Sequence, residues 1–328
     1  MIDATRADSM LPPHVGETVV TVGTFDGVHR GHLDVLLRLA ARAKSTGRAS
    51  LLLTFEPHPL EVLSPGSAPA LLTTRHEKLA AIACSGIDYV VILPFTRELA
   101  EHSAAQFVDL LCARLRLAEL LIGHDHGFGK GRAGDVDTLR TLAAARGFAV
   151  EVIAPVQTGD GKAVSSTRIR RAVASGDLAA ASEGLGRRYS VAGRVGRGES
   201  RGRGLGFPTL NVRPESPRKL LPPDGVYAVE VDTTRGRFGG MMNLGGRPTF
   251  GDVVRGIEAH LFDALGDFYG DQVQVNFVAR LRDIRRFDDA AALRQQLSID
   301  EQDARRALTL LAESGNLKGS MHFPPSTP

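Results

Sequence analysis

The chain has 328 residues, 43% of them hydrophobic and 23% charged, and a formal net charge of only +3. This length allows two domains with substantial cores. No apolar run approaches the ~20 residues that a membrane-spanning helix needs, and residues 1–13 lack the apolar segment of a signal peptide. Cys84 and Cys112 form no C-x-x-C pair, so they are interpreted as buried reduced thiols of a soluble cytoplasmic protein.

Short apolar runs alternate with helical patterns over residues 18–186. Strands are expected at 19–22, 50–55, 89–94, 120–122 and 149–153, and helices around Leu36, Leu79, Val108 and Leu142. This alternation predicts an α/β fold with a doubly wound parallel sheet covered on both faces. Ligands in such a fold collect at the carboxyl ends of the strands, where the motifs below occur.

The first expected strand leads into Val-Gly-Thr-Phe-Asp-Gly-Val-His-Arg-Gly-His at residues 22–32. Gly23 lets the backbone approach a ligand closely, and Gly31 opens the next helix. His29 and His32 are three residues apart, so both imidazoles lie beside one helix N-terminus, which suits phosphate. Surface histidines or half of a metal site are the alternatives, but no Cys or carboxylate lies nearby at ligand spacing. The glycines do not follow G-x-G-x-x-G, which excludes a dinucleotide turn.

Three further segments follow expected strands. Glu56-Pro57-His58-Pro59 either ends its strand or contributes substrate contacts. The glycine-dense loop at 123–132, with Lys130 and Arg132, either surrounds a phosphate or is merely flexible, and it is not a Walker A loop. In residues 164–170 one hydroxyl is explained as a helix N-cap, but three in a row followed by an arginine predict a second phosphate-binding helix start.

From about residue 187 the pattern changes to short alternating strands. They are expected at 189–195, 226–231, 238–244, 257–262 and 273–281, separated by turns rich in Gly, Asp and Pro. This pattern predicts a small antiparallel β-barrel, and residues 288–296 and 300–311 are expected to form C-terminal helices. The predicted domains are therefore 15–186 and 187–314, with flexible tails at 1–14 and 315–328.

The barrel region carries two candidate groups of catalytic residues. Thr209 and Asn211 are two apart, so on a strand they face the same side and can hold a hydrated Mg²⁺, although local turn bonds also explain such residues. At 257–262, alternation sends Glu258 and His260 away from the apolar side chains. Glu258 is either simply solvated or a positioned base for phosphoryl transfer to an alcohol.

The first group of motifs resembles the H-x-G-H turn of nucleotidylyltransferases in the form G-x-F-D-G-V-H-x-G-H. With T-F-E-P-H-P, G-x-D-x-x-F-G-x-x-R-x-G-D and V-S-S-T-R-I-R in order, it is similar to the FMN adenylyltransferase half of bifunctional riboflavin kinase/FAD synthetases. The family loop commonly reads Asp-Phe-Arg-Phe-Gly, whereas this chain has Asp125-His126-Gly127-Phe128-Gly129, so contacts of that first Phe and the Arg are not carried over. The resemblance implies that His29 and His32 are catalytic. It also implies that ATP and FMN are bound by Gly23, Phe25, Asp26, His58, Asp125, Phe128, Gly129, Ser165, Ser166, Thr167 and Arg170.

The barrel motifs resemble the riboflavin kinase half of the same family. The usual Pro-Thr-Ala-Asn is Pro208-Thr209-Leu210-Asn211 here, and the metal site is expected to survive because Leu210 faces away from its neighbours. The resemblance implies Mg²⁺ at Thr209 and Asn211, and Glu258 as the base. It further implies ATP or flavin contacts by Gly193, Val195, Gly198, Gly204, Gly206, Pro208, Asn243 and Arg247.

The implied function is a two-step synthesis with Mg²⁺ as cofactor. Riboflavin is phosphorylated by ATP to FMN in the barrel half, and a second ATP adenylylates FMN to FAD in the first half, releasing pyrophosphate. One alternative is a monofunctional transferase whose barrel only binds flavin. Another is a flavin- or RNA-binding regulator that uses the arginine-rich segments, but stacking aromatics are scarce. We expect small-molecule substrates, no nucleic-acid or membrane partner, and a monomer or weak homo-oligomer.

Overall fold

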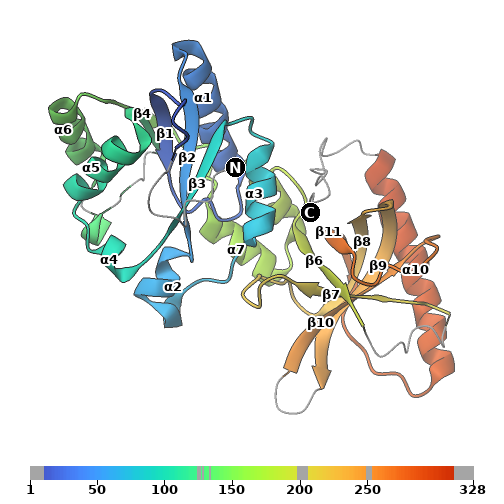
Figure 1. The fold of residues 1–328 in the computed structure, drawn as a ribbon. Helices are drawn as coiled ribbons and strands as arrows, with labels where there is room; N and C mark the ends of the chain where they lie inside the picture. The colour runs from blue at the N-terminus through green and yellow to red at the C-terminus, as the bar shows by residue number, and fades with distance from the viewer. Residues whose placement is uncertain are drawn as a thin grey trace. The chain divides into compact units, whose positions relative to one another are not determined.

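A five-stranded parallel sheet forms the first half of the chain in this computed structural model (Figure 1), which describes residues 11–123, 127, 129–132, 134–197, 206–248 and 253–313. The strand order is β3-β2-β1-β4-β5. All five strands expected from the sequence are present, with ends that differ by at most three residues. They are β1 (Thr18–Val22), β2 (Ala49–Glu56), β3 (Tyr89–Pro94), β4 (Leu117–Gly123) and β5 (Ala149–Ile153).

Helices cover both faces of this sheet, as the sequence predicts. Val20, Leu53 and Leu120 pack with the apolar residues of α5 and α6 on one face. The alternate strand residues point to the other face, where α1 packs on β1, β2 and β4. The helices of this half, including 3₁₀ turns η1 and η2, are α1 (Arg30–Thr46), α2 (Pro59–Leu63), η1 (Pro65–Ser67), α3 (Arg75–Ala83), α4 (Arg97–Ala100), α5 (Ala104–Leu115), η2 (Lys130–Arg132) and α6 (Val136–Arg146). Two further helices, α7 (Ser166–Ser175) and α8 (Leu178–Leu185), group with the barrel that follows them.

Local sequence explains where the main helices begin and end. Ser103 and Gln106 form a reciprocal capping box at the start of α5, which satisfies two amides that have no partner within the helix. α1 ends at Gly47, which adopts the left-handed conformation (φ 66°) that glycine reaches at no steric cost.

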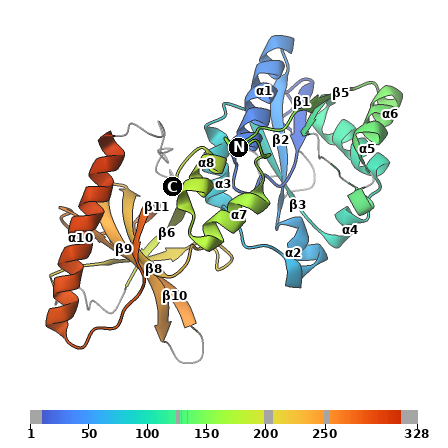
Figure 2. The ribbon, with the colours of Figure 1, turned by 180° about the vertical axis from the view of Figure 1, so that it is seen from behind.

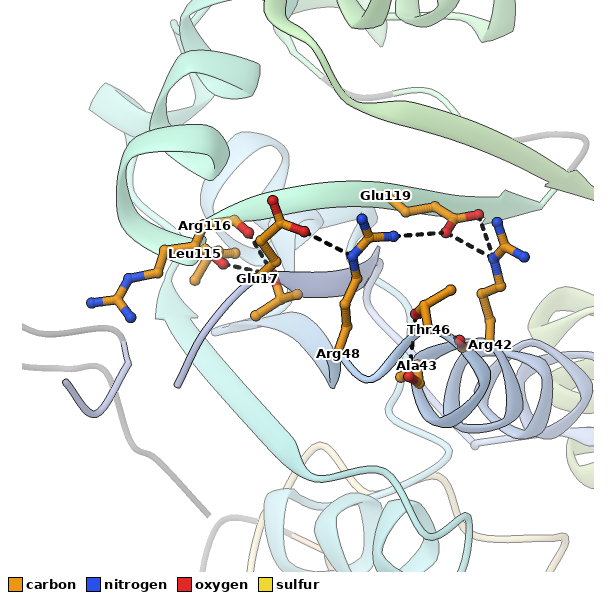
Figure 3. A network of polar contacts seen from close by, with 9 residues as sticks. Glu17, Arg42, Ala43, Thr46, Arg48, Leu115, Arg116 and Glu119 are labelled. Carbon is orange, nitrogen blue, oxygen red and sulfur yellow. Dashed lines mark hydrogen bonds and ion pairs between the residues drawn. The ribbon is translucent and has the colours of Figure 1, made fainter. Parts of the chain in front are cut away.

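The amino-terminal edge of the sheet is held by an ion-pair network (Figure 3). Glu119 at the start of β4 is almost fully buried and accepts hydrogen bonds from Nε of Arg42 at 2.8 and 2.9 Å. Arg48 lies between Glu119, at 3.9 Å, and Glu17, at 2.9 Å. Thr18 in turn donates to the Leu115 carbonyl at 2.6 Å. The charged residues thus fasten one edge, and the motif-bearing loops follow the carboxyl ends of the strands at the other edge.

The second half is a closed antiparallel barrel with the strand order β10-β7-β6-β11-β8-β9. The predicted barrel is therefore confirmed. Its strands are β6 (Ser190–Gly196), β7 (Leu210–Pro214), β8 (Gly225–Thr233), β9 (Gly236–Pro248), β10 (Val253–Leu261) and β11 (Gln272–Arg282).

One continuous helix, α10 (Ala290–Glu313), packs along β8, β9 and β11 (Figure 2). The expectation of two C-terminal helices is wrong here, because residues 297–299 between them contain no glycine or proline to interrupt the helix. Asp300 of α10 is buried and accepts two hydrogen bonds from Arg282 of β11, at 2.7 and 2.6 Å. This bidentate pair fixes the helix on the barrel.

The chain divides into two compact units, and the division does not follow the chain order. Residues 70–77 group with residues 166–328, and the remainder of the first 165 residues forms the other unit. Among the described helices, none is both long and apolar enough to cross a membrane.

The two cysteines differ in exposure. Cys84 is exposed, which corrects the expectation of a buried thiol, because α3 ends at Ala83, one residue before it. Cys112 is half-buried.

Candidate functional site

His29 and His32 lie together at the start of α1. His29 is the N-cap residue, and its Nδ1 accepts a hydrogen bond from the His32 amide at 3.2 Å. The two imidazole rings stack with centroids 3.6 Å apart, and the Phe25 ring lies 4.6 Å from that of His32. Both predicted histidines are therefore held at one helix N-terminus, beside the end of the central strand β1.

The turn that presents these histidines has an unusual backbone. Phe25 and Val28 have φ of 48° and 38°, which is costly for residues with a Cβ, and Asp26 between them is buried. A Cβ on Gly23 would stand 2.9 Å from the Phe25 ring, and a Cβ on Gly31 would stand 3.2 Å from the His29 ring. A side chain at Gly23 would therefore displace the Phe25 ring, and one at Gly31 would crowd the His29 ring, which adds a reason to the one drawn from the sequence.

The carboxyl end of β2 supports this turn. Thr54 donates to the Thr24 carbonyl at 3.1 Å, and the buried Lys78 places Nζ 3.4 Å from the Phe55 carbonyl. No sequence pattern selects Lys78, because a lysine in a helical pattern is usually solvated. His58 caps α2 with its Nδ1, which accepts from the Leu60 amide at 3.2 Å.

The predicted phosphate loop after β4 is described in part. Asp125 and Phe128 lie outside the described residues. Gly129 has φ 75°, and a Cβ there would stand 2.7 Å from the Ala104 amide, so only glycine fits. The exposed Lys130 donates to Glu101 at 2.6 Å, and this contact raises the pKa of the lysine.

The segment Ser165–Arg170 starts α7 at Ser166, as expected for a helix with hydroxyls at its beginning. Arg170 donates from Nε to the Ala70 carbonyl at 3.0 Å. Ser166 and Arg170 belong to the unit that contains the barrel, and Ser165 to the unit that contains the parallel sheet. The predicted grouping of α7 with the histidine turn stays a prediction.

In the barrel, strand register brings three predicted residues into one row. Glu258 of β10 pairs with Asn211 of β7 on one side and with Asn243 of β9 on the other. Directly paired residues on adjacent strands have side chains on the same face. Ile257, Ala259 and Leu261 are buried, so Glu258 and His260 face away from the core, as the alternation predicts. A carboxylate flanked by two amides results.

A cavity of about 480 Å³ adjoins this row. Thr209 and Asn211 line it together with Arg197 and Asp267, and Asn211 is 9% exposed. The Arg197 guanidinium lies 5.2 Å from the centre of the Tyr269 ring, which also lines the cavity. The lining therefore combines neutral oxygens, charges of both signs and an aromatic face.

Family comparisons match both halves in this order. The family model for FAD synthetase matches residues 11–168, and that for riboflavin kinase matches residues 185–308. The chain is 40% identical to the bifunctional riboflavin kinase/FMN adenylyltransferase of Pseudomonas fluorescens over 90% of this chain and 94% of that protein. This chain belongs to the bifunctional riboflavin kinase/FMN adenylyltransferase family. The protein of that name from Escherichia coli K12 is 39% identical over 88% of this chain and 91% of its own length.

A solved structure has the same fold as this family member. The crystal structure of a macrolide-efflux protein from Streptococcus pneumoniae matches with a TM-score of 0.82 and 29% identity. The match covers 91% of this chain and 96% of that one.

Of the remaining residues predicted for the kinase half, some line the cavity, some lie elsewhere in the barrel, and two are not described. Val195 and Pro208 line the cavity. Gly193 of β6 has no room for a Cβ beside the Arg213 carbonyl, and Gly206 has φ 88°. Arg247 lies on β9 opposite Val254 of β10. Gly198 and Gly204 lie outside the described residues.

Proposed function

We propose that the two halves of this chain catalyse successive steps of FAD synthesis. The barrel half transfers the γ-phosphate of ATP to riboflavin, giving FMN and ADP. The parallel-sheet half joins FMN to the AMP portion of a second ATP, giving FAD and pyrophosphate. We place the division of the two activities at residue 187, with 15–186 and 187–314 as the two catalytic domains. The observation that carries the proposal is Glu258 between Asn211 and Asn243 beside the cavity.

The cavity residues fit an Mg²⁺ ion carried by the nucleotide. Thr209 and Asn211 both line the cavity, and their neutral oxygens are of the kind that Mg²⁺ accepts alongside water and phosphate oxygens. Thr209 and Asn211 would hold the ion. When bound, the ion neutralises charge on the transferring phosphates. Arg197 and the Tyr269 ring in the same lining favour a phosphate chain and a planar base, respectively.

Glu258 acts as the base of the kinase step. The 5′-hydroxyl of riboflavin is a weak nucleophile at neutral pH, so a carboxylate that accepts its proton assists attack on the γ-phosphorus. Strand pairing sets Glu258 between Asn211 and Asn243, so its carboxylate stands in a row of polar side chains. The position of Glu258 in the row is the basis of this role.

The adenylyl step needs no base, because the FMN phosphate is already an anion. Its oxygen attacks the α-phosphorus of ATP, and pyrophosphate leaves. His29 and His32 at the start of α1 stabilise the charge that develops on the phosphates, together with the helix amides. Positioning and charge stabilisation account for the catalysis.

The test is an incubation of the purified full-length chain with riboflavin, ATP and Mg²⁺, with products separated by chromatography. We expect FMN to appear first and FAD to follow. FAD from supplied FMN, without FMN from riboflavin, supports instead the alternative in which the barrel only binds flavin. Absence of both products contradicts the proposal. The use of ATP as substrate also supports the expected cytoplasmic location. The predicted oligomeric state, a monomer or weak homo-oligomer, can be measured by sedimentation analysis.

A further inference from the structure

His260 makes a side-chain contact that the proposed chemistry leaves unused. Its Nδ1 lies 2.8 Å from the carbonyl oxygen of Pro208. A carbonyl can only accept, so Nδ1 carries the hydrogen and donates. His260 is two residues after Glu258 on β10 and shares its face of the strand.

This contact occurs where the regular strand pairing ends. The β7–β10 register runs through Val212–Ile257, Asn211–Glu258 and Leu210–Ala259. One further step would set His260 opposite Thr209, but β7 starts at Leu210. Pro208 has no amide hydrogen to contribute to a ladder. The imidazole thus supplies a hydrogen bond beyond the last pair of the ladder.

Aromatic rings hold the imidazole in this orientation. The Phe207 ring lies 5.3 Å from it and the Phe262 ring 5.9 Å, both edge-on. Phe262 is itself buried and carries the Arg305 guanidinium at 4.4 Å from its ring centre. The histidine therefore joins a packed aromatic cluster to the Pro208 carbonyl.

We propose that His260 is a positioning residue that fixes Thr209 for the Mg²⁺–nucleotide site of the kinase half. Pro208 and Thr209 both line the cavity, so a shift of the Pro208 peptide moves the Thr209 hydroxyl there. His260 touches neither substrate nor ion and acts through this peptide. The inference rests on the proposed function for the identity of the nucleotide site.

The decisive comparison is His260→Asn against His260→Gln in the full-length chain. The Asn amide nitrogen occupies the position of Nδ1 and can still donate to Pro208, whereas the longer Gln amide reaches the position of Nε2. Both are polar and suit a half-buried site. His260→Leu removes the donor altogether.

ADP binding is measured by calorimetry with and without Mg²⁺. We expect His260→Gln and His260→Leu to weaken Mg²⁺-dependent ADP binding about tenfold, the loss of one well-placed hydrogen bond. Metal-free ADP affinity and the rate of FAD formation from supplied FMN stay unchanged, and His260→Asn binds as the wild type does. In kinase assays the KM for ATP rises more than the KM for riboflavin.

The outcomes separate this inference from the proposed function. Wild-type Mg²⁺-dependent binding in both the Gln and Leu variants overturns the positioning role, as does equal weakening in Asn and Gln. If the wild type makes no FMN but binds ADP with the expected variant pattern, the role of His260 stands and the kinase assignment fails.

Discussion

The Lys219 ammonium lies between the Glu77 carboxylate and the Leu72 carbonyl, 2.6 Å from an oxygen of each. The two charged side chains are 2% and 3% exposed, although they are 142 residues apart in sequence. Glu77 also accepts from the Ala192 amide of β6 at 2.6 Å, and the Tyr189 ring lies 4.6 Å from the ammonium. This pair therefore fastens residues 70–77 within the unit that contains the barrel.

Lys219→Met is expected to destabilise this unit strongly. It leaves the Glu77 carboxylate buried without its cation, which typically lowers the free energy of unfolding by about 3–5 kcal/mol. Urea unfolding of the full-length chain, followed by circular dichroism, measures the change. The double variant Glu77→Gln/Lys219→Met should lose less than the sum of the two single variants, because neither charge is then left alone.

Lys130→Met is the matched control. Lys130 and Glu101 are also 2.6 Å apart, but their side chains are 66% and 67% exposed. Water screens such a pair, so no measurable loss of stability is expected. Equal losses for Lys130→Met and Lys219→Met would show that burial does not set the strength of these contacts.

Glu258→Gln is expected to abolish FMN formation selectively. The amide fits the same place between Asn211 and Asn243 but cannot accept the proton of the hydroxyl, which costs roughly 10²–10⁴-fold in rate. FAD formation from supplied FMN should stay at the wild-type rate, and chromatography follows both products. A variant that still phosphorylates riboflavin normally removes Glu258 from the mechanism. Loss of both steps in a folded variant contradicts the assignment of one activity to each half.

Most of the fold could be predicted because the burial of each strand is reflected in the pattern of apolar residues along the sequence. Parallel strands covered on both faces read as continuous apolar runs, and the half-exposed barrel strands read as alternation. The position of residues 70–77 could not be predicted, because Glu77 looks like an ordinary charge in the first turn of a helix. Only the fold brings Lys219 to it. The sequence pattern predicts two C-terminal helices, whereas α10 is continuous because residues 297–299 contain no glycine or proline.

For the site, local patterns predicted which way side chains point and left their neighbours undetermined. Alternation placed Glu258 on the outer face of its strand, but its pairing with Asn211 and Asn243 depends on register between strands distant in sequence. The N-cap role of His29 could have been predicted from the sequence, because the motif follows an expected strand and leads directly into an expected helix. Lys78 gave no sequence signal, since its burial is a tertiary effect.

His29→Asn and His29→Ala should separate capping from catalysis. Asn is a good N-cap and keeps an acceptor for the His32 amide, whereas Ala loses about 1 kcal/mol of helix stability. Neither retains the imidazole, so both are expected to form FAD from FMN roughly 10²-fold more slowly. Riboflavin phosphorylation should not change in either variant. If His29→Asn makes FAD at the wild-type rate, the histidine serves only to cap α1.

The two cysteines should differ in reactivity and in its pH dependence. Alkylating reagents attack the thiolate, and burial raises the pKa of the Cys112 thiol, with Asp109 adding to the effect. Cys84 is exposed. With iodoacetamide at pH 8 we expect Cys84 to be labelled first, measured by peptide mass spectrometry. As pH rises, labelling of Cys112 should continue to accelerate beyond the ordinary pKa of a free thiol, because its thiolate forms at higher pH. Asp109→Asn should speed Cys112 labelling by lowering its pKa while leaving Cys84 unchanged, and faster labelling of Cys112 than Cys84 in the wild type would contradict the effect of burial.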